Sequence, residues 1–305
     1  MKSKIIIYLL VIYSSQTFAN FASIRFEAHD TNYALGQWSE NDEWALEAQY
    51  SFRYNFFSCD LFNRPAILGC KDENKTDIEL FFKYTGKFDF YLDSRDSGPI
   101  INRLSNPALH LRWIYKDKNR SINMFDLGLE HRSNGQTVDA DELDLNPNSP
   151  TYGQHIAEIE HQNNNHQYFD TISRGADYLS LTLGGVVWKN LEYELSTKLY
   201  FNSEESQVTW GKLAGNKTSF KDYDTINLKL TKELSKTLKT EIDYKVGLSG
   251  LATDSADIYL MYRWSSKTEG WNIPIFFKAH FGPMERLSDY TNSITSYGLG
   301  ILFYH

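Results

Sequence analysis

The chain has 305 residues, of which 15% are aromatic and 23% are charged, and its mean hydropathy is -0.48. No segment approaches the roughly twenty apolar residues of a transmembrane helix, which argues against a helical membrane protein. The formal net charge of -8 argues against nucleic acid as a partner. A polar chain rich in Tyr, Phe and Trp is instead typical of a transmembrane β-barrel. In such barrels lipid-facing apolar residues alternate with polar residues of the lumen, and aromatic girdles mark the membrane interfaces.

The N-terminus has the pattern of a secretory signal peptide. A short basic start precedes an apolar run at Ile5–Tyr13, and Thr17-Phe18-Ala19 resembles a small-residue cleavage site. The apolar run is too short to span a bilayer, and no second apolar stretch follows, so a retained anchor is the weaker alternative. We therefore expect residues 1–19 to be removed and residues 20–305 to form one barrel domain in the bacterial outer membrane.

Alternation of apolar and polar residues predicts the strands. Between residues 44 and 56, apolar side chains occupy every second position and mostly polar side chains lie between them. Eleven such segments recur along the chain, and residues 32–38 supply a further one. Barrels of this type close with an even number of strands, so we expect an all-β fold, a twelve-stranded antiparallel transmembrane β-barrel; a soluble β-sandwich is the alternative. The expected strands include residues 32–38, 44–56, 78–88, 109–115, 122–134, 177–183, 191–195, 226–230, 242–248, 258–264, 273–279 and 297–303.

The connections between these segments differ in length. Residues 116–120 and 189–190 are short, whereas residues 135–174 are long and rich in Asn, Asp, Gln and Pro. Short turns belong to the periplasmic end of such a barrel and long loops to the outer end. The two cysteines, Cys59 and Cys70, lie in another expected loop. Because the periplasm is oxidising, we expect a disulfide between them, with two reduced thiols as the alternative.

On two neighbouring strands, a row of apolar side chains is followed by polar residues at the end of the strand. On the strand at residues 122–134, an apolar face that points at lipid continues into His131 and Ser133. On the next strand a ladder of leucines ends in Asp177, and antiparallel pairing should bring Asp177 level with His131 and Ser133. A Ser nucleophile, a His base and an acidic residue that orients the His are the parts that acyl transfer needs. Ordinary polar residues of the membrane interface are the alternative.

Several segments resemble motifs of the outer-membrane phospholipase A family. Residues 130–136 (EHRSNGQ) resemble its H-x-S-N-G motif, and residues 173–177 (SRGAD) resemble its S-R-x-x-N motif. Further likenesses occur at residues 29–33 (HDTNY), at 97–99 (SGP) followed by Asn106-Pro107, and at 281–290 (FGPMERLSDY), which is similar to its Y-G-x-S-L-I-D-Y stretch. The resemblance runs from about residue 29 to the C-terminus.

This resemblance implies a twelve-stranded, calcium-dependent barrel that hydrolyses sn-1 and sn-2 acyl esters of phospholipids and lysophospholipids and is active as a homodimer. Matched position by position, it makes Ser133 the nucleophile and His131 the general base. Asp177 stands where the family has Asn. An anionic partner stabilises an imidazolium more than an amide does, so we expect activity to be retained.

The resemblance also implies a calcium ion (Ca2+) near the nucleophile, at the interface between two subunits. Its matched ligands are Ser97 from the other subunit, and Gln136 and Ser173 from the subunit that carries Ser133. Gln136 would use its carbonyl and stands where the family has Arg. Calcium prefers hard oxygen ligands and keeps several waters, which it can polarise into an oxyanion hole. The segment between Gln136 and Ser173 is much longer than in the family, which leaves the position of Ser173 open.

Two other functions stay as alternatives. A porin or adhesion scaffold would have no enzymatic activity, and a barrel lipase that deacylates lipopolysaccharide would share the chemistry with another substrate. The expected lumen carries opposed charges, which should pair and plug a small barrel. These lumenal residues are Glu47, Arg53, Glu79, Lys83, Glu130, Arg132, Glu192 and Lys198.

Overall fold

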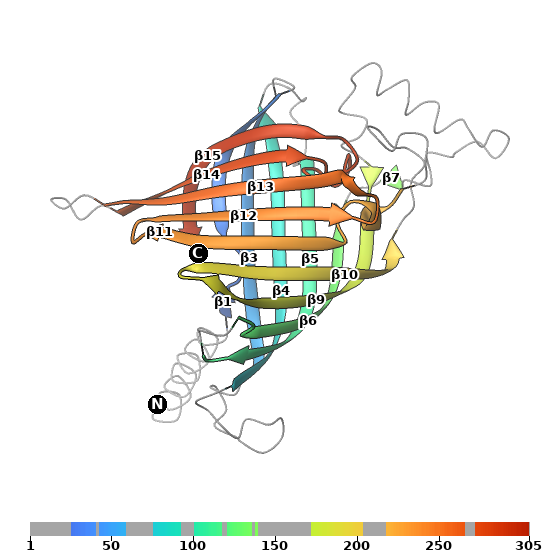
Figure 1. The fold of residues 1–305 in the computed structure, drawn as a ribbon. Coiled ribbons are helices and arrows are strands. Elements are labelled where there is room, and N and C mark those ends of the chain that lie inside the picture. Colours follow the sequence, from blue (N-terminus) through green and yellow to red (C-terminus); the bar gives the residue numbers. More distant parts are fainter. Residues whose placement is uncertain are drawn as a thin grey trace, which may run out of the picture.

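The chain folds into a closed β-barrel (Figure 1). The computed structural model describes residues 26–40, 43–58, 76–92, 101–117, 121–135, 138–139, 172–203, 218–265 and 272–304. Within these ranges no helix is long and apolar enough to cross a membrane. The expected signal peptide, both cysteines, Ser97 and Gln136 lie outside the described residues.

One antiparallel sheet forms the wall and closes on itself because β3 also pairs with β4. Its strands are β1 (Phe26–Ala28), β2 (Asn32–Ser39), β3 (Trp44–Ser58), β4 (Thr76–Leu92), β5 (Ile101–Tyr115), β6 (Met124–Ser133), β9 (Gly175–Trp188), β10 (Leu191–Ser203), β11 (Ile226–Ser235), β12 (Leu238–Gly247), β13 (Gly250–Ser265), β14 (Asn272–Gly282) and β15 (Ile294–Tyr304). Two short strands, β7 (Val138–Asp139) and β8 (Ile172–Ser173), form a separate parallel pair.

β1 and β2 share one position in the wall. Both pair with β3, Phe26 opposite Tyr54 and Tyr33 opposite Gln49, and the other edge of β3 is occupied by β4. Together they form a single strand that is interrupted between them, so the thirteen-stranded sheet is a barrel of twelve strands. The expected fold class is confirmed, and a strand overlaps every segment predicted from alternation. The sequence analysis did not predict β1, β7 or β8.

The turns follow the expected pattern only in part. Lys189 and Asn190 connect β9 to β10, and Asn190 has a φ of 59°, a left-handed conformation that Asn tolerates. The connection at residues 248–249 is equally short. Counted along the strands, it lies at the same end of the barrel as the long loop that follows β6, and so does the four-residue connection between β2 and β3; short turns were not expected there. The seventeen residues between β3 and β4 connect the opposite ends of their strands, where a short turn was expected.

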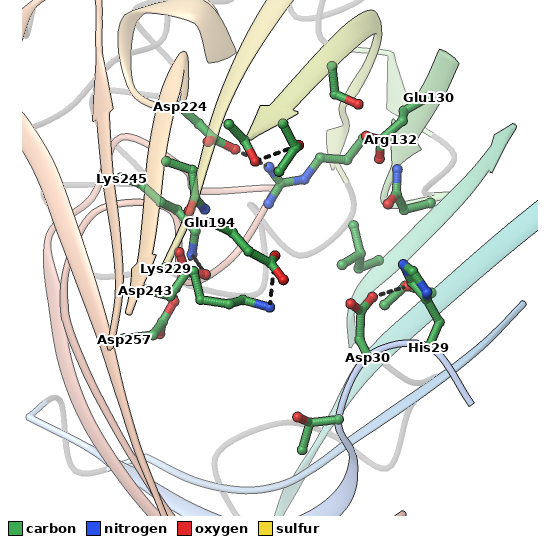
Figure 2. Close-up of a pocket in the computed structure, with 18 of the residues that line it drawn as sticks. His29, Asp30, Glu130, Arg132, Glu194, Asp224, Lys229, Asp243, Lys245 and Asp257 are labelled. Carbon is green, nitrogen blue, oxygen red and sulfur yellow. Dashed lines mark hydrogen bonds and ion pairs between the residues drawn. The ribbon is translucent and has the colours of Figure 1, made fainter. Parts of the chain in front are cut away.

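The interior of the barrel is polar and charged (Figure 2). Glu47 is fully buried, and its carboxylate lies 2.9 Å from the amino groups of both Lys87 and Lys278. Lys83 and Glu130 form another lumenal pair at 3.4 Å. The space left among these side chains is a cavity of about 320 Å³ that is lined by both signs of charge. The expected pairing of lumenal charges is therefore present, although Glu192 is exposed.

Apolar residues cover one mouth of the lumen. The short 3-10 helix η3 (Phe220–Asp222) and the connection between β14 and β15 contribute to a buried cluster. Its members are Ala176, Phe220, Tyr223, Met284, Leu287 and Tyr290. Ala176 precedes Asp177 in β9, so the cluster fills the end of the barrel at which His131, Ser133 and Asp177 lie.

Candidate active site

The end of β6 carries His131 and Ser133 on the outer wall. Leu129 is 51% exposed on this wall, whereas Glu130 is buried in the lumen. Alternation continues along the strand, so the His131 side chain, which is 47% exposed, lies outside and Arg132 points inward. Ser133 comes next on the outer face and is half-buried. Both residues therefore lie on the side of the wall that was expected.

Asp177 lies directly beside His131. The two residues pair in the register of β6 and β9, and Asp177 Oδ1 is 2.7 Å from His131 Nδ1. Ser133 pairs with Gly175 in the same register. Among the described residues no hydrogen bond joins the Ser133 hydroxyl to the His131 ring. Catalytic hydrogen bonds of this kind are often long without substrate, so the geometry is compatible with a Ser-His-Asp arrangement.

A side chain on β5 fixes the backbone of His131. The register of β5 and β6 puts Pro107 opposite His131, and proline has no N–H to donate to the ladder. The side-chain amide of Asn106 instead donates a hydrogen bond of 2.8 Å to the His131 carbonyl oxygen. Pro107 thus interrupts the backbone hydrogen bonds between β5 and β6 beside the site, and the side chain of Asn106 replaces the missing donor.

Buried ion pairs hold the inner face of the same strand. The Arg132 guanidinium lies 2.6 Å from the Asp224 carboxylate (Figure 2). The same carboxylate accepts a hydrogen bond from the amino group of Lys198. Asp224 follows η3 and is fully buried. Burial alone would raise the pKa of Asp224, but Lys198 and Arg132 hold that pKa well below its ordinary value. The Asp224 carboxylate therefore connects the end of β6 to β10 and to the segment that covers the lumen.

The segments around the expected calcium ligands meet beyond Ser133. Asn134 donates its N–H to the Arg174 carbonyl, and the Arg174 N–H donates to Asn134 Oδ1. These bonds extend the pairing of Ser133 with Gly175, so Ser173 lies close to the end of β6. Gly135 has a φ of +60°, and no atom of the described residues lies within 4 Å of where its Cβ atom would stand.

A second group of potential metal ligands lies inside the barrel. The side chains of Asp257, His280 and Glu285 converge, and His280 Nδ1 is 2.9 Å from each carboxylate. Lys245 and Lys278 already neutralise these acids at 2.7 and 3.0 Å. This group contains a nitrogen ligand and lies on β13, on β14 and in the connection that follows β14, across the barrel from β6. It therefore does not fit the calcium site that the resemblance implies.

Two supporting residues were missed by the sequence analysis. Asn106 was noted only as part of a motif, although an Asn-Pro pair inside a strand is itself a signal of an open ladder. Asn202 donates a hydrogen bond of 3.1 Å to Asp177 Oδ2. Regular alternation would turn Asn202 into the lumen, so no pattern in the sequence indicates this contact.

Comparison with known proteins supports the fold. No family model matches the sequence, and no curated protein matches it either. Among solved structures, outer membrane phospholipase A from Escherichia coli is similar with a TM-score of 0.61 and 17% identity, over 94% of this chain and 96% of that one. The outer membrane phospholipase of Salmonella typhi, solved as a dimer with bound calcium, is similar with a TM-score of 0.60 and 17% identity, over 92% of each chain. The chain therefore has the fold of these outer-membrane barrels.

Proposed function

We propose that the protein is a phospholipase of the bacterial outer membrane that hydrolyses sn-1 and sn-2 acyl esters of phospholipids and lysophospholipids. The observation that carries this proposal is the 2.7 Å contact between His131 and Asp177 on the lipid-facing wall, with Ser133 two positions along the strand. An ordinary polar residue of the membrane interface would not need a charged partner on the neighbouring strand. A serine, an imidazole and a carboxylate at one level match the requirements of acyl transfer.

In the proposed reaction, Ser133 Oγ attacks the ester carbonyl carbon while His131 Nε2 accepts the hydroxyl proton. Asp177 accepts the hydrogen bond from His131 Nδ1–H, which leaves the lone pair of Nε2 free and stabilises the imidazolium. His131 then returns the proton to the leaving alcohol, a lysophospholipid when the substrate is a phospholipid. Water hydrolyses the acyl-enzyme with His131 again acting as base.

The position of the site suits a lipid substrate. It lies on the open outer wall, where the exposed Leu129, Leu179 and Leu181 face the acyl chains of the membrane. A lipid that diffuses laterally can present its ester to Ser133 without entering the lumen.

We propose Ser97, Gln136 and Ser173 as calcium ligands, with Ser97 supplied by the other subunit of a homodimer. All three offer hard oxygen atoms, which suit this ion, and Ser173 lies next to the end of β6. Bound calcium would supply positive charge, through its waters, for the oxyanion of the tetrahedral intermediate. The calcium-bound dimer of the Salmonella typhi structure supports this part of the proposal.

A porin is less compatible with the interior of the barrel. Ion pairs such as Glu47–Lys278 and Lys83–Glu130 occupy the lumen, and the remaining cavity is about 320 Å³. A solute channel requires a wider barrel with an open aqueous interior.

Phospholipid turnover tests the proposal. Purified protein in detergent micelles, supplied with calcium, should release fatty acid from phospholipid, and Ser133→Ala should reduce this release to background. Ser105→Ala is the matched control, because Ser105 pairs with Ser133 from the neighbouring strand, and it should keep most of the activity. Calcium chelation should also abolish turnover. Undiminished hydrolysis by Ser133→Ala would refute the proposed nucleophile.

A further inference from the structure

Both oxygen atoms of the Asp177 carboxylate have a partner. Oδ1 lies 2.7 Å from His131 Nδ1, and Oδ2 accepts a hydrogen bond of 3.1 Å from the side-chain amide of Asn202. Asn202 belongs to β10, which pairs with β9 (Figure 1). Three adjacent strands, β10, β9 and β6, thus contribute a continuous chain of side chains that ends at the imidazole.

A β-bulge in β10 brings Asn202 to this position. Tyr200 pairs with Tyr178, but the register then shifts, and Asn202 rather than Phe201 pairs with Asp177. As a result Phe201 and Asn202 are both exposed on the outer wall, although consecutive residues of a regular strand face opposite sides. Bulges next to active sites re-aim side chains in this way. The irregularity therefore has a specific consequence, which is the contact with Asp177.

We propose that Asn202 is a positioning residue whose amide holds the Asp177 carboxylate in the orientation that faces His131. This inference rests on the roles proposed above for His131 and Asp177. The Asp177 side chain is 33% exposed, and rotation about the bond to its carboxylate is a broad, weakly restricted torsion. Without a second partner the carboxylate would exchange between His131 and water. Asn202 acts through Asp177 and does not need to touch the substrate.

The chemistry of the amide provides a specific test. In the wild type the Asn202 amide donates to a carboxylate. Asn202→Asp would place two carboxylates against each other, which is unfavourable when Asp177 is present. When Asp177 is itself replaced by Asn, the carboxylate at position 202 can accept a hydrogen bond from the new amide. The effect of Asn202→Asp should therefore depend on the residue at position 177.

We suggest measuring kcat and KM for phospholipid in detergent micelles, with calcium, for Asn202→Ala, Asn202→Asp, Asp177→Asn and the double variant Asp177→Asn/Asn202→Asp. Thr197→Ala is the control, because Thr197 is exposed on the same strand and lies away from Asp177. Asn202→Ala should lower kcat about fivefold, the effect of one lost hydrogen bond, and leave KM unchanged. Asn202→Asp should lower kcat about tenfold in the wild-type background and less than twofold in the Asp177→Asn background.

The outcomes separate this inference from the proposed function. An Asn202→Asp effect that is equal in both backgrounds, or wild-type kcat in Asn202→Ala, would overturn the positioning role even if Ser133 is essential. The labelling rate of Ser133 by an alkyl fluorophosphonate gives an independent readout, and it should fall in Asn202→Ala as kcat does. If the proposed function itself fails, the wild type will not be labelled at Ser133 at all. Heat-dependent gel mobility will show whether each variant is folded.

Discussion

Replacing Asp177 separates the two contributions that this carboxylate makes to His131. Its charge stabilises the imidazolium that forms when His131 accepts the Ser133 proton, and its hydrogen bond holds the ring in position. Asp177→Asn removes the charge but keeps an acceptor oxygen, whereas Asp177→Ala removes both. Glu192→Ala is a matched control, because it also removes an exposed acid, but from the end of β10 that lies far from Asp177.

The structure sets the size of each effect. Two unit charges about 4 Å apart interact by about 1 kcal/mol in water and about 4 kcal/mol at an effective dielectric constant near 20. The His131 and Asp177 side chains are 47% and 33% exposed, so the lower part of this range applies. A charge contribution of about 1.4 kcal/mol predicts a tenfold loss of activity in Asp177→Asn. Losing the hydrogen bond as well, about 1.5 kcal/mol more, predicts a roughly hundredfold loss in Asp177→Ala.

The assay is kcat/KM for fatty acid release from phospholipid in detergent micelles at saturating calcium. Glu192→Ala should match the wild type within twofold. Asp177→Ala activity within threefold of the wild type would refute the role of the carboxylate. Equal losses in Asp177→Asn and Asp177→Ala would show that orientation by the hydrogen bond contributes nothing.

Three further predictions concern the surroundings of the site. Asn106→Ala removes the donor to the His131 carbonyl and should lower kcat about fivefold in the same assay, while the barrel stays folded; an unchanged kcat would exclude this support. Asp224→Asn leaves two buried cations poorly compensated and should lower stability by about 3 to 5 kcal/mol, seen as a lower temperature of heat modification on gels. The pKa of Asp224 is held below its ordinary value, so its stabilising effect is complete at neutral pH and is lost only as the pH falls through that lowered pKa; the two proteins should become equally stable only in strong acid. Wild-type protein in planar bilayers should show no porin-like conductance because ion pairs fill the lumen, and a large steady conductance would contradict this.

Regular alternation made most of the wall predictable. Each apolar face on the outer wall leaves a readable period of two in the sequence, from Trp44 in β3 to Phe303 in β15. The same period placed His131 and Ser133 outside the barrel, and antiparallel pairing across the long loop brought Asp177 level with them. These inferences needed only the alternation of side chains and the order of the strands.

Local departures from the regular strand were not predictable. Asn202 reaches Asp177 only because β10 contains a bulge, and no residue of that segment marks the shift. The sequence also gives no sign of the interruption between β1 and β2, because residues 29–31 include no glycine or proline. Asp224 lies in a connection, where no periodicity exists, so its pairing with Arg132 depends on the folded path of the chain. Irregular segments carry much of the support for the site, and their placement follows from tertiary structure.

Covalent trapping of Ser133 tests the central claim most directly. Purified protein treated with an alkyl fluorophosphonate, with calcium present, should gain one adduct that peptide mass spectrometry assigns to Ser133, and phospholipid hydrolysis should fall in proportion. His131→Ala should react far more slowly. An adduct on another residue that abolishes activity, or full hydrolysis by protein modified at Ser133, would contradict a serine nucleophile on the outer wall.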